Sequence, residues 1–145
     1  MNVMFTVPGE PTGKARPRFF NRGGKSMAIT PQKTVMYENL IKTCFIEQCG
    51  TFFGESPLIM RIQAYYMIPK SASKKKLVMM EVGIIRPTKK PDADNVAKGV
   101  ADSLNGIAYK DDSQIVTMNV EKFYSDAPRV VVEIEKWEGP SSGND

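Results

Sequence analysis

LIMRIQAYYMI, residues 58–68, is the stretch that most clearly sets the fold of this chain. Every second residue in it, from Leu58 to Ile68, is apolar or aromatic, and these side chains would share one face. This period-two alternation is typical of a β-strand with one buried face. Pro69 follows directly and has no N–H for a sheet hydrogen bond, so the strand is expected to end there.

Strand patterns occur on both sides of this stretch. Residues 2–7 alternate in the same way and stop at Pro8. Residues 115–124 and 129–137 are two further expected strands, and the turn at residues 125–128 predicts that they form a hairpin.

Three stretches have helical patterns. The first is expected to begin with Thr30 as N-cap and Pro31 at the first helical position, and to end near Gly50. Its apolar residues repeat every four positions, which is typical of a helix packed on a sheet. Residues 71–82 predict a shorter helix. Residues 94–105 predict a third, with Asn105-Gly106 as a left-handed C-terminal cap and these residues facing inward: Val96, Ala97, Val100, Ala101 and Leu104.

The order of these elements predicts an α+β fold. The chain has 145 residues, enough for one domain, and residues 1–137 are expected to form it. The expected architecture is a small mixed β-sheet with helices packed mainly on one face. The last residues, EGPSSGND at 138–145, are expected to form a flexible tail.

Composition restricts the chemistry. The chain has no histidine and only two cysteines, Cys44 and Cys49. A Ser–His or Cys–His nucleophile, a zinc site built on histidine and a disulfide framework are therefore excluded. The chain has no apolar run of eighteen residues and its N-terminus lacks the pattern of a secretory signal, so a cytoplasmic protein without a membrane segment is expected.

Residues 8–30 form a Gly- and Pro-rich basic segment, expected as a long hairpin or an ordered loop with a turn at residues 21–24. The net charge of +4 favours a polyanionic partner, and Glu10 is the only acid in the segment. Phe19 and Phe20 would either stack at an unpaired base or pack into the core. Five side chains are expected to contact DNA phosphates, unless the segment is simply a solvated loop: Lys14, Arg16, Arg18, Arg22 and Lys25.

PDADNVAK, residues 91–98, and YKDD, residues 109–112, carry the candidate catalytic residues. A phosphodiester is anionic, so carboxylates assist its hydrolysis only if they hold a divalent cation. Asp92 and Asp94 are two residues apart at a helix start, and Asp112 would join them from a second segment. Lys98, one turn beyond Asp94, would stabilise developing negative charge.

Structural interpretations of the same residues stay open. An aspartate at a helix start is often a cap, and Asp111-Asp112 is an ordinary turn composition. Lys98 would form an i,i+4 pair with Asp94 or with Asp102. An EF-hand loop is excluded, because Val96 and Ala97 occupy the positions where a third oxygen ligand and a glycine are required.

DADNVAKGVADSLN (92–105), followed by KDDSQIV (110–116), resembles the RusA family of Holliday-junction resolvases. The detailed likeness covers residues 91–116, and the basic segment is longer here than in the shortest family members. The resemblance implies that Asp92, Asp94 and Asp112 bind Mg²⁺, with Mn²⁺ as a substitute, that Lys98 assists catalysis and that Asp111 is a second-rank ligand. It also implies a symmetric homodimer that nicks two opposing strands of a four-way DNA junction, often encoded by a prophage.

Two other functions are compatible with the same residues. One is a non-catalytic module that binds DNA or another partner, in which the aspartates only cap and solubilise. The other is a nuclease that acts on flaps or other branched DNA. The sequence leaves open the cleavage preference, the number of metal ions, the path of the DNA, and whether Asp111 or Asp112 is the inner ligand.

Overall fold

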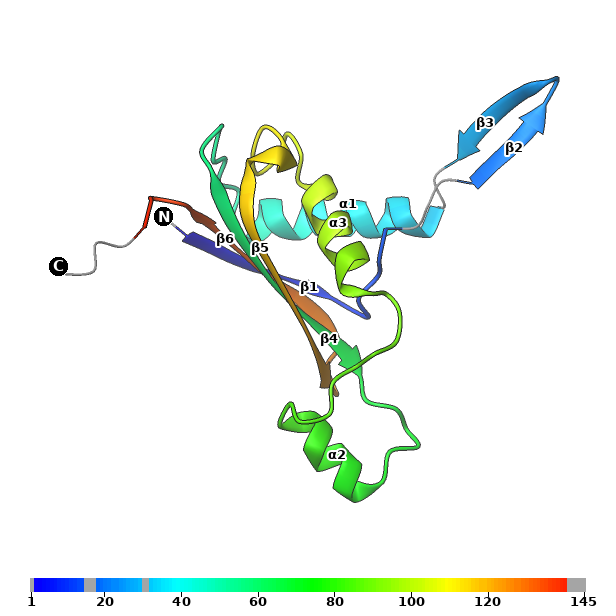
Figure 1. The fold of residues 1–145 in the computed structure, drawn as a ribbon, viewed down its shortest axis with the longest axis vertical. Helices are drawn as coiled ribbons and strands as arrows, with labels where there is room; N and C mark the ends of the chain where they lie inside the picture. The colour runs from blue at the N-terminus through cyan, green and yellow to red at the C-terminus, as the bar shows by residue number, and fades with distance from the viewer. Residues whose placement is uncertain (1, 15–17, 30–31, 141–145) are drawn as a thin grey trace.

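The computed structural model describes residues 2–14, 18–29 and 32–140. In this part of the chain the strands are β1 (Asn2–Pro8), β2 (Arg18–Arg22), β3 (Lys25–Ile29), β4 (Leu58–Met67), β5 (Ile115–Ser125) and β6 (Arg129–Lys136). The helices are α1 (Gln32–Gln48), α2 (Lys74–Glu81) and α3 (Ala93–Ser103), and a short 3₁₀ helix, η1 (Asp112–Gln114), precedes β5. Figure 1 shows their arrangement.

Four strands form one mixed sheet in the order β1-β6-β4-β5. β4 pairs with β5 in parallel and with β6 antiparallel, and β1 pairs with β6 antiparallel. The alternation predicted for residues 58–68 is confirmed, since the side chains from Leu58 to Ile68 that share one face are all buried. The sheet therefore has one face against the core, as expected.

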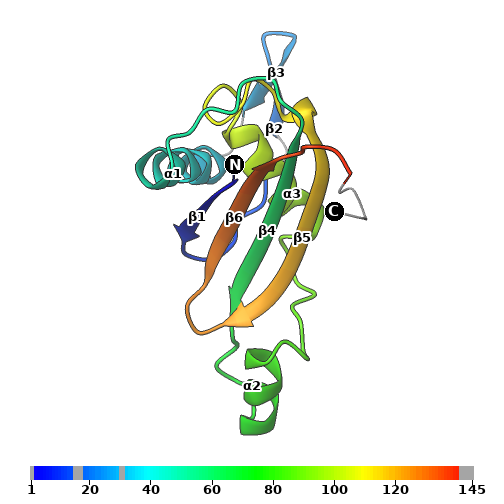
Figure 2. The ribbon, with the colours of Figure 1, turned by 90° about the vertical axis from the view of Figure 1, so that its left-hand side faces the viewer.

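Helices α1 and α3 lie over the same face of this sheet, and α2 lies beyond its end (Figures 1 and 2). Their apolar side chains close the core with those of the strands, among them Phe5, Ile41, Phe45, Ile62, Val96, Val100, Leu104 and Val132. The predicted α+β class, with a small mixed sheet and helices mainly on one face, is confirmed.

The predicted hairpin of residues 115–124 and 129–137 is wrong. Both strands exist, but β4 lies between them, so β5 and β6 do not pair. Strands two positions apart lie about 10 Å apart, and the connection from Ser125 to Arg129 can span about 13 Å. A short polar turn therefore fits this crossover as well as a hairpin. Strand β4 lies between β5 and β6, and its side chains on the face that packs against the core are all buried.

The basic segment contains the hairpin β2–β3, with Gly23 and Gly24 at its turn in left-handed conformation. Thr30 and Pro31, the predicted start of the first helix, lie outside the described residues. The second helix starts later than predicted, at Lys74, because the Ser73 side chain accepts a hydrogen bond from the main chain of Lys76 and caps it.

Helix α3 ends two residues earlier than predicted, and Leu104 is its C-cap, with φ −94°. Gly106 is left-handed, as expected, but it belongs to the turn that follows, where its N–H bonds to the Tyr109 carbonyl. The predicted left-handed cap at Asn105-Gly106 is therefore wrong.

No helix among the described residues has the length and apolarity needed to cross a membrane. Of the predicted tail, residues 138–140 have no helix or strand, and residues 141–145 lie outside the described part of the chain.

Candidate active site

A pocket between α3 and the start of β5 brings together three of the predicted site residues. Asp94 and Lys98 extend from α3, and Asp112 comes from η1. The pocket has a volume of about 360 Å³, and its apolar lining is Ala97, Ala101, Ile115 and Met118. Carboxylates and a lysine thus face the same space from two segments that the sequence separates.

Helix α3 places these side chains because of its local sequence. Asp92 caps its N-terminus, with Oδ1 accepting a hydrogen bond from the Asn95 N–H at 3.0 Å. Asp94 lies in the first turn, where the helix dipole favours negative charge. The buried stripe of α3 includes Val96 and Val100, which leaves Asp94 and Lys98 to share another side at i,i+4 spacing.

Asp92 is exposed and does not line the pocket with Asp94 and Asp112. Its position is fixed by the preceding connector, where the Tyr66 hydroxyl donates to the Pro91 carbonyl at 2.5 Å. Lys122 donates to the Lys89 carbonyl at 2.7 Å on the same connector. The structure therefore shows Asp92 as a helix cap, and it brings only two of the three expected ligands together.

Asp111 and Asp112 have different roles in η1. The Asp111 carboxylate accepts a hydrogen bond from the Ser113 N–H at 2.9 Å. The Ser113 side chain, and then this main-chain bond, lower the pKa of Asp111. The Gln114 side chain completes a capping box with Asp111. The main chain of Asp112 donates to Asn105 Oδ1 at 2.7 Å, and its carboxyl group lines the pocket. Asp112 is therefore better placed than Asp111 as an inner ligand.

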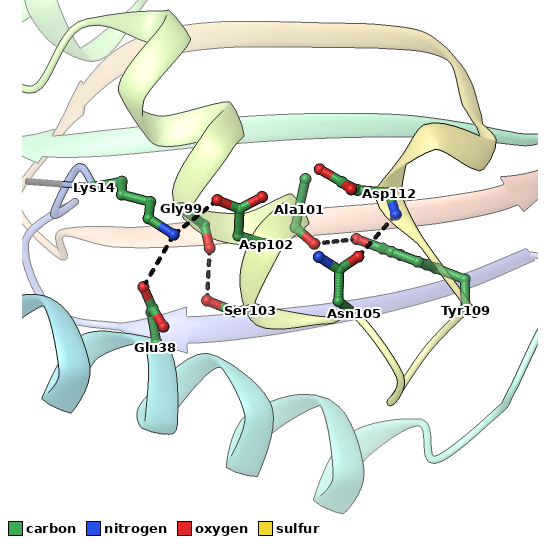
Figure 3. Close-up of polar contacts among 9 residues, drawn as sticks. All are labelled: Lys14, Glu38, Gly99, Ala101, Asp102, Ser103, Asn105, Tyr109 and Asp112. Carbon is green, nitrogen blue, oxygen red and sulfur yellow. Dashed lines mark hydrogen bonds and ion pairs between the residues drawn. The ribbon is translucent and has the colours of Figure 1, made fainter. Parts of the chain in front are cut away.

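Asp102 lies next to the candidate site (Figure 3), and the sequence predicted it only as a partner for Lys98. Its carboxylate accepts a hydrogen bond from Lys14 Nζ at 2.8 Å, and Glu38 lies 3.7 Å from the same nitrogen (Figure 3). Partial burial and then the neighbouring Asp102 carboxyl raise the pKa of Asp112. The four-residue spacing of residues 94, 98 and 102 was the signal that placed Asp102 on this side of α3.

Neither predicted i,i+4 ion pair of Lys98 is formed in the part of the chain that the structure describes. Asp102 pairs with Lys14 instead, across 88 residues of sequence. Lys98 is exposed and its ammonium group is available at the pocket.

Tyr109 fixes the loop that carries Asp112. This side chain is fully buried, and its hydroxyl donates to the Ala101 carbonyl of α3 at 2.6 Å (Figure 3). Burial raises the pKa of Tyr109, so the hydroxyl keeps its proton and remains a donor. Tyr109 and Asn105 together hold η1 against the C-terminal end of α3.

The donors at the pocket are suited to a hard cation. Asp94 and Asp112 offer only oxygen ligands, and Mg²⁺ commonly uses one or two carboxylates together with waters and substrate phosphates. Within residues 2–14, 18–29 and 32–140, no three acidic, cysteine or histidine side chains lie close enough to form a complete protein cage for a metal. The residues therefore fit an open Mg²⁺ site that keeps positions for water and substrate.

The predicted phosphate contacts are only partly described. Lys14 is engaged with Asp102 and Glu38 and is not a free surface cation. Arg16 lies outside the described residues. The main chain of the hairpin β2–β3 extends away from the sheet (Figure 1). The structure does not describe the side chains of three predicted phosphate contacts on this hairpin: Arg18, Arg22 and Lys25.

Comparison with known proteins gives two findings. A family model described as endodeoxyribonuclease RusA matches residues 8–135, which include every predicted site residue. The chain is also similar to the uncharacterized protein YqaN of Bacillus subtilis (strain 168). The two are 42% identical over 136 residues, which cover 92% of this chain and 96% of the relative.

Proposed function

The chain belongs to the RusA family of endodeoxyribonucleases, and on this basis we propose that it resolves four-way Holliday junctions by paired symmetric nicks that depend on Mg²⁺. The observation that carries the proposal is the shared pocket of Asp94, Lys98 and Asp112. We also propose that it acts in the cytoplasm, because a junction-cleaving enzyme must reach DNA.

Asp94 and Asp112 are the proposed ligands inside the pocket. Asp92 is proposed as the third, because only Oδ1 is used in its cap hydrogen bond among the described contacts. Asp111 ranks below them by the family resemblance alone, since it too uses one carboxylate oxygen as a cap. When bound, the ion would supply positive charge against the phosphodiester and lower the pKa of an attacking water, and Mn²⁺ is an expected substitute.

Lys98 has a separate proposed role. Its ammonium group makes no ion pair within the described residues and lines the same pocket as the two carboxylates. A lysine in this position stabilises the charge that develops on phosphate oxygens in the transition state. The phosphate backbone farther from the cleavage point is proposed to lie along the basic segment, on Arg16, Arg18, Arg22 and Lys25.

We also propose a homodimer, and the two edges of the sheet support this. At the β1 edge, the Gln48 side chain bonds both the N–H and the carbonyl of Thr6, at 2.9 and 2.8 Å, so this edge is covered. At the β5 edge, the Arg86 side chain donates a hydrogen bond to the Lys122 carbonyl. Among the described residues, no other group outside the sheet bonds the main chain of residues 116–124. An open edge strand can pair with a second copy by two-fold symmetry.

The dimer is tested by sedimentation equilibrium on the wild type and on Val116→Lys, since Val116 is 57% exposed on this edge. A lysine there should convert a dimer into a monomer. A monomeric wild type would exclude the homodimer, and a variant that stays dimeric would exclude the β5 edge as its interface.

Cleavage is tested with a labelled synthetic four-way junction, with linear duplex and flap substrates alongside. Wild type, Asp92→Asn, Asp94→Asn and the control Asp126→Asn, which changes an exposed turn residue, are compared in Mg²⁺, Mn²⁺ and EDTA. Paired nicks on the junction are expected for wild type and the control with either metal ion. The two site variants should bind the junction without cutting it, because each loses a ligand charge and no phosphate contact.

The other outcomes separate the alternatives. Tight junction binding by wild type without cleavage would favour a non-catalytic module, in which Asp92 and Asp111 serve only as the caps that the structure shows. Preferential cutting of flaps would keep the nuclease chemistry and change the substrate. Full activity of Asp92→Asn would remove that residue from the ligand set.

A further inference from the structure

Lys14 contacts the candidate site through Asp102. Lys14 Nζ donates to Asp102 Oδ2 at 2.8 Å, and the Asp102 carboxyl lies next to that of Asp112, which lines the pocket (Figure 3). Figure 3 shows Asp102 between the lysine on one side and Asp112 on the other. A residue from the N-terminal segment is therefore connected to the site by one intervening side chain.

The main chain delivers Lys14 to this position. Its N–H bonds to the Asn95 carbonyl of α3 at 3.2 Å. Gly13 packs so closely on α3 that an added Cβ would lie 2.8 Å from the Pro91 Cβ and 2.9 Å from the Asn95 Cβ. Gly99 lies beneath Lys14 on the same helix. Lys14 thus belongs to a segment packed along α3, unlike the hairpin residues that follow it.

The local charges argue against a phosphate contact by Lys14. Its side chain is only 30% exposed and it lies between Glu38 and Asp102, so this group of three side chains carries a net charge of −1. DNA phosphate would be repelled by such a group. Figure 3 shows the carboxyl groups of Asp102 and Asp112 near each other, and two neighbouring carboxylates repel each other unless a cation compensates their charge.

We propose that Lys14 is a positioning residue of the active site, which holds Asp102 in place and through it the Asp112 carboxyl group. This inference rests on the proposed function, because it assigns Lys14 to the catalytic pocket and removes it from the predicted phosphate contacts. Without the lysine, repulsion from Asp102 turns Asp112 away from the pocket.

The test compares Lys14→Met with Lys14→Arg, which keeps the charge, and with Lys42→Met, which removes one charge from an α1 lysine without a described partner. Junction affinity is measured across a range of salt concentrations, and cleavage is measured at saturating protein. For Lys14→Met we expect a cleavage rate at least tenfold lower, an affinity within twofold of wild type and an unchanged salt slope. Lys14→Arg and Lys42→Met should cleave within threefold of wild type.

A phosphate contact would give the opposite result. The affinity of Lys14→Met would fall, its salt slope would decrease by about one, and its cleavage rate at saturation would match wild type. That result would overturn the proposal.

A thermal cycle tests the proposal without cleavage. Melting temperatures are measured for Lys14→Met, Asp112→Asn and the double variant. If the charge of Lys14 offsets the repulsion between the Asp102 and Asp112 carboxylates, removing Lys14 should matter less once Asp112 is neutral. Lys14→Met should then lower the melting temperature at least twice as much in the wild type as in Asp112→Asn. Equal decreases would refute the positioning role even if junction cleavage is confirmed. If the wild type fails to cleave the junction, the proposed function is refuted. The thermal cycle still tests the positioning role of Lys14, because it does not depend on cleavage.

Discussion

Two glycines at one contact lead to predictions of opposite sign. Gly13 and Gly99 both lie where the segment before the basic hairpin packs on α3. Neither has a positive φ, so alanine is compatible with the backbone at both positions. Only the space around the new methyl group differs, which makes Gly13→Ala and Gly99→Ala a matched pair.

At Gly13 the added Cβ would lie 2.8 Å from the Pro91 Cβ and 2.9 Å from the Asn95 Cβ. Carbon atoms in contact are normally about 3.5–4.0 Å apart, so either α3 or the segment must move. Overpacking of this kind costs about 1–3 kcal/mol. At about 2–4 °C per kcal/mol, we expect Gly13→Ala to lower Tm by about 2–12 °C.

At Gly99 the nearest atom to the added Cβ is the Lys14 main-chain nitrogen, at 3.6 Å, which is an ordinary contact. Gly99 is inside α3, where alanine is favoured over glycine by about 1 kcal/mol. We therefore expect Gly99→Ala to raise Tm by about 2–4 °C.

Differential scanning calorimetry of the two variants and the wild type at one protein concentration checks both values. The same samples should show slower junction cleavage for Gly13→Ala, because Lys14 is displaced from Asp102. If Gly13→Ala were as stable as wild type, or if Gly99→Ala lost as much stability as Gly13→Ala, the close packing of this segment on α3 would be refuted.

Three further predictions concern stability. Tyr109→Phe removes the buried hydrogen bond to the Ala101 carbonyl and should lower the free energy of unfolding, measured by urea titration, by about 1–3 kcal/mol. The control Tyr65→Phe removes only an exposed hydrogen bond and should lower it by less than about 0.5 kcal/mol. Equal losses of stability would contradict the anchoring role of Tyr109. Burial raises the pKa of Tyr37 to about 12, against about 10 in an unfolded chain, so the folded state holds this proton more tightly and stability should fall as pH rises above about 10. In Tyr37→Phe that fall should be shallower by up to about 1.4 kcal/mol per pH unit, and an unchanged profile in chemical denaturation between pH 8 and 11.5 would argue against it. Gln48→Ala uncovers the β1 edge and should cost about 1 kcal/mol and promote self-association in light scattering; a variant as monodisperse and as stable as wild type would show that Gln48 does not protect this edge.

The fold could be predicted wherever one residue pattern had one structural meaning. The alternation of residues 58–68 allowed only a half-buried strand, and the buried stripe of α3 allowed only a helix on the sheet. The order of the strands could not be predicted in the same way. The turn at residues 125–128 has the same composition whether its strands pair directly or enclose β4.

The candidate site was predictable only in its local part. Asp94 and Lys98 share one side of α3 because four residues make about one turn, and this was readable from the sequence. The pairing of Lys14 with Asp102 joins residues 88 positions apart and depends on the close approach at Gly13. In the sequence, Lys14 is indistinguishable from the other cations of the basic segment.

The balance of charge at α3 connects these observations with the expected chemistry. The pocket holds Asp94 and Asp112 against Lys98 alone, while the charge of Lys14 is taken up by Asp102 and Glu38. The pocket is therefore net negative, and a DNA phosphate brought to it would be repelled. A divalent cation shared by the two carboxylates and the phosphate reverses the sign of this interaction. The proposed dependence of cleavage on a metal ion and the proposed role of Lys14 therefore rest on the same distribution of charge around α3.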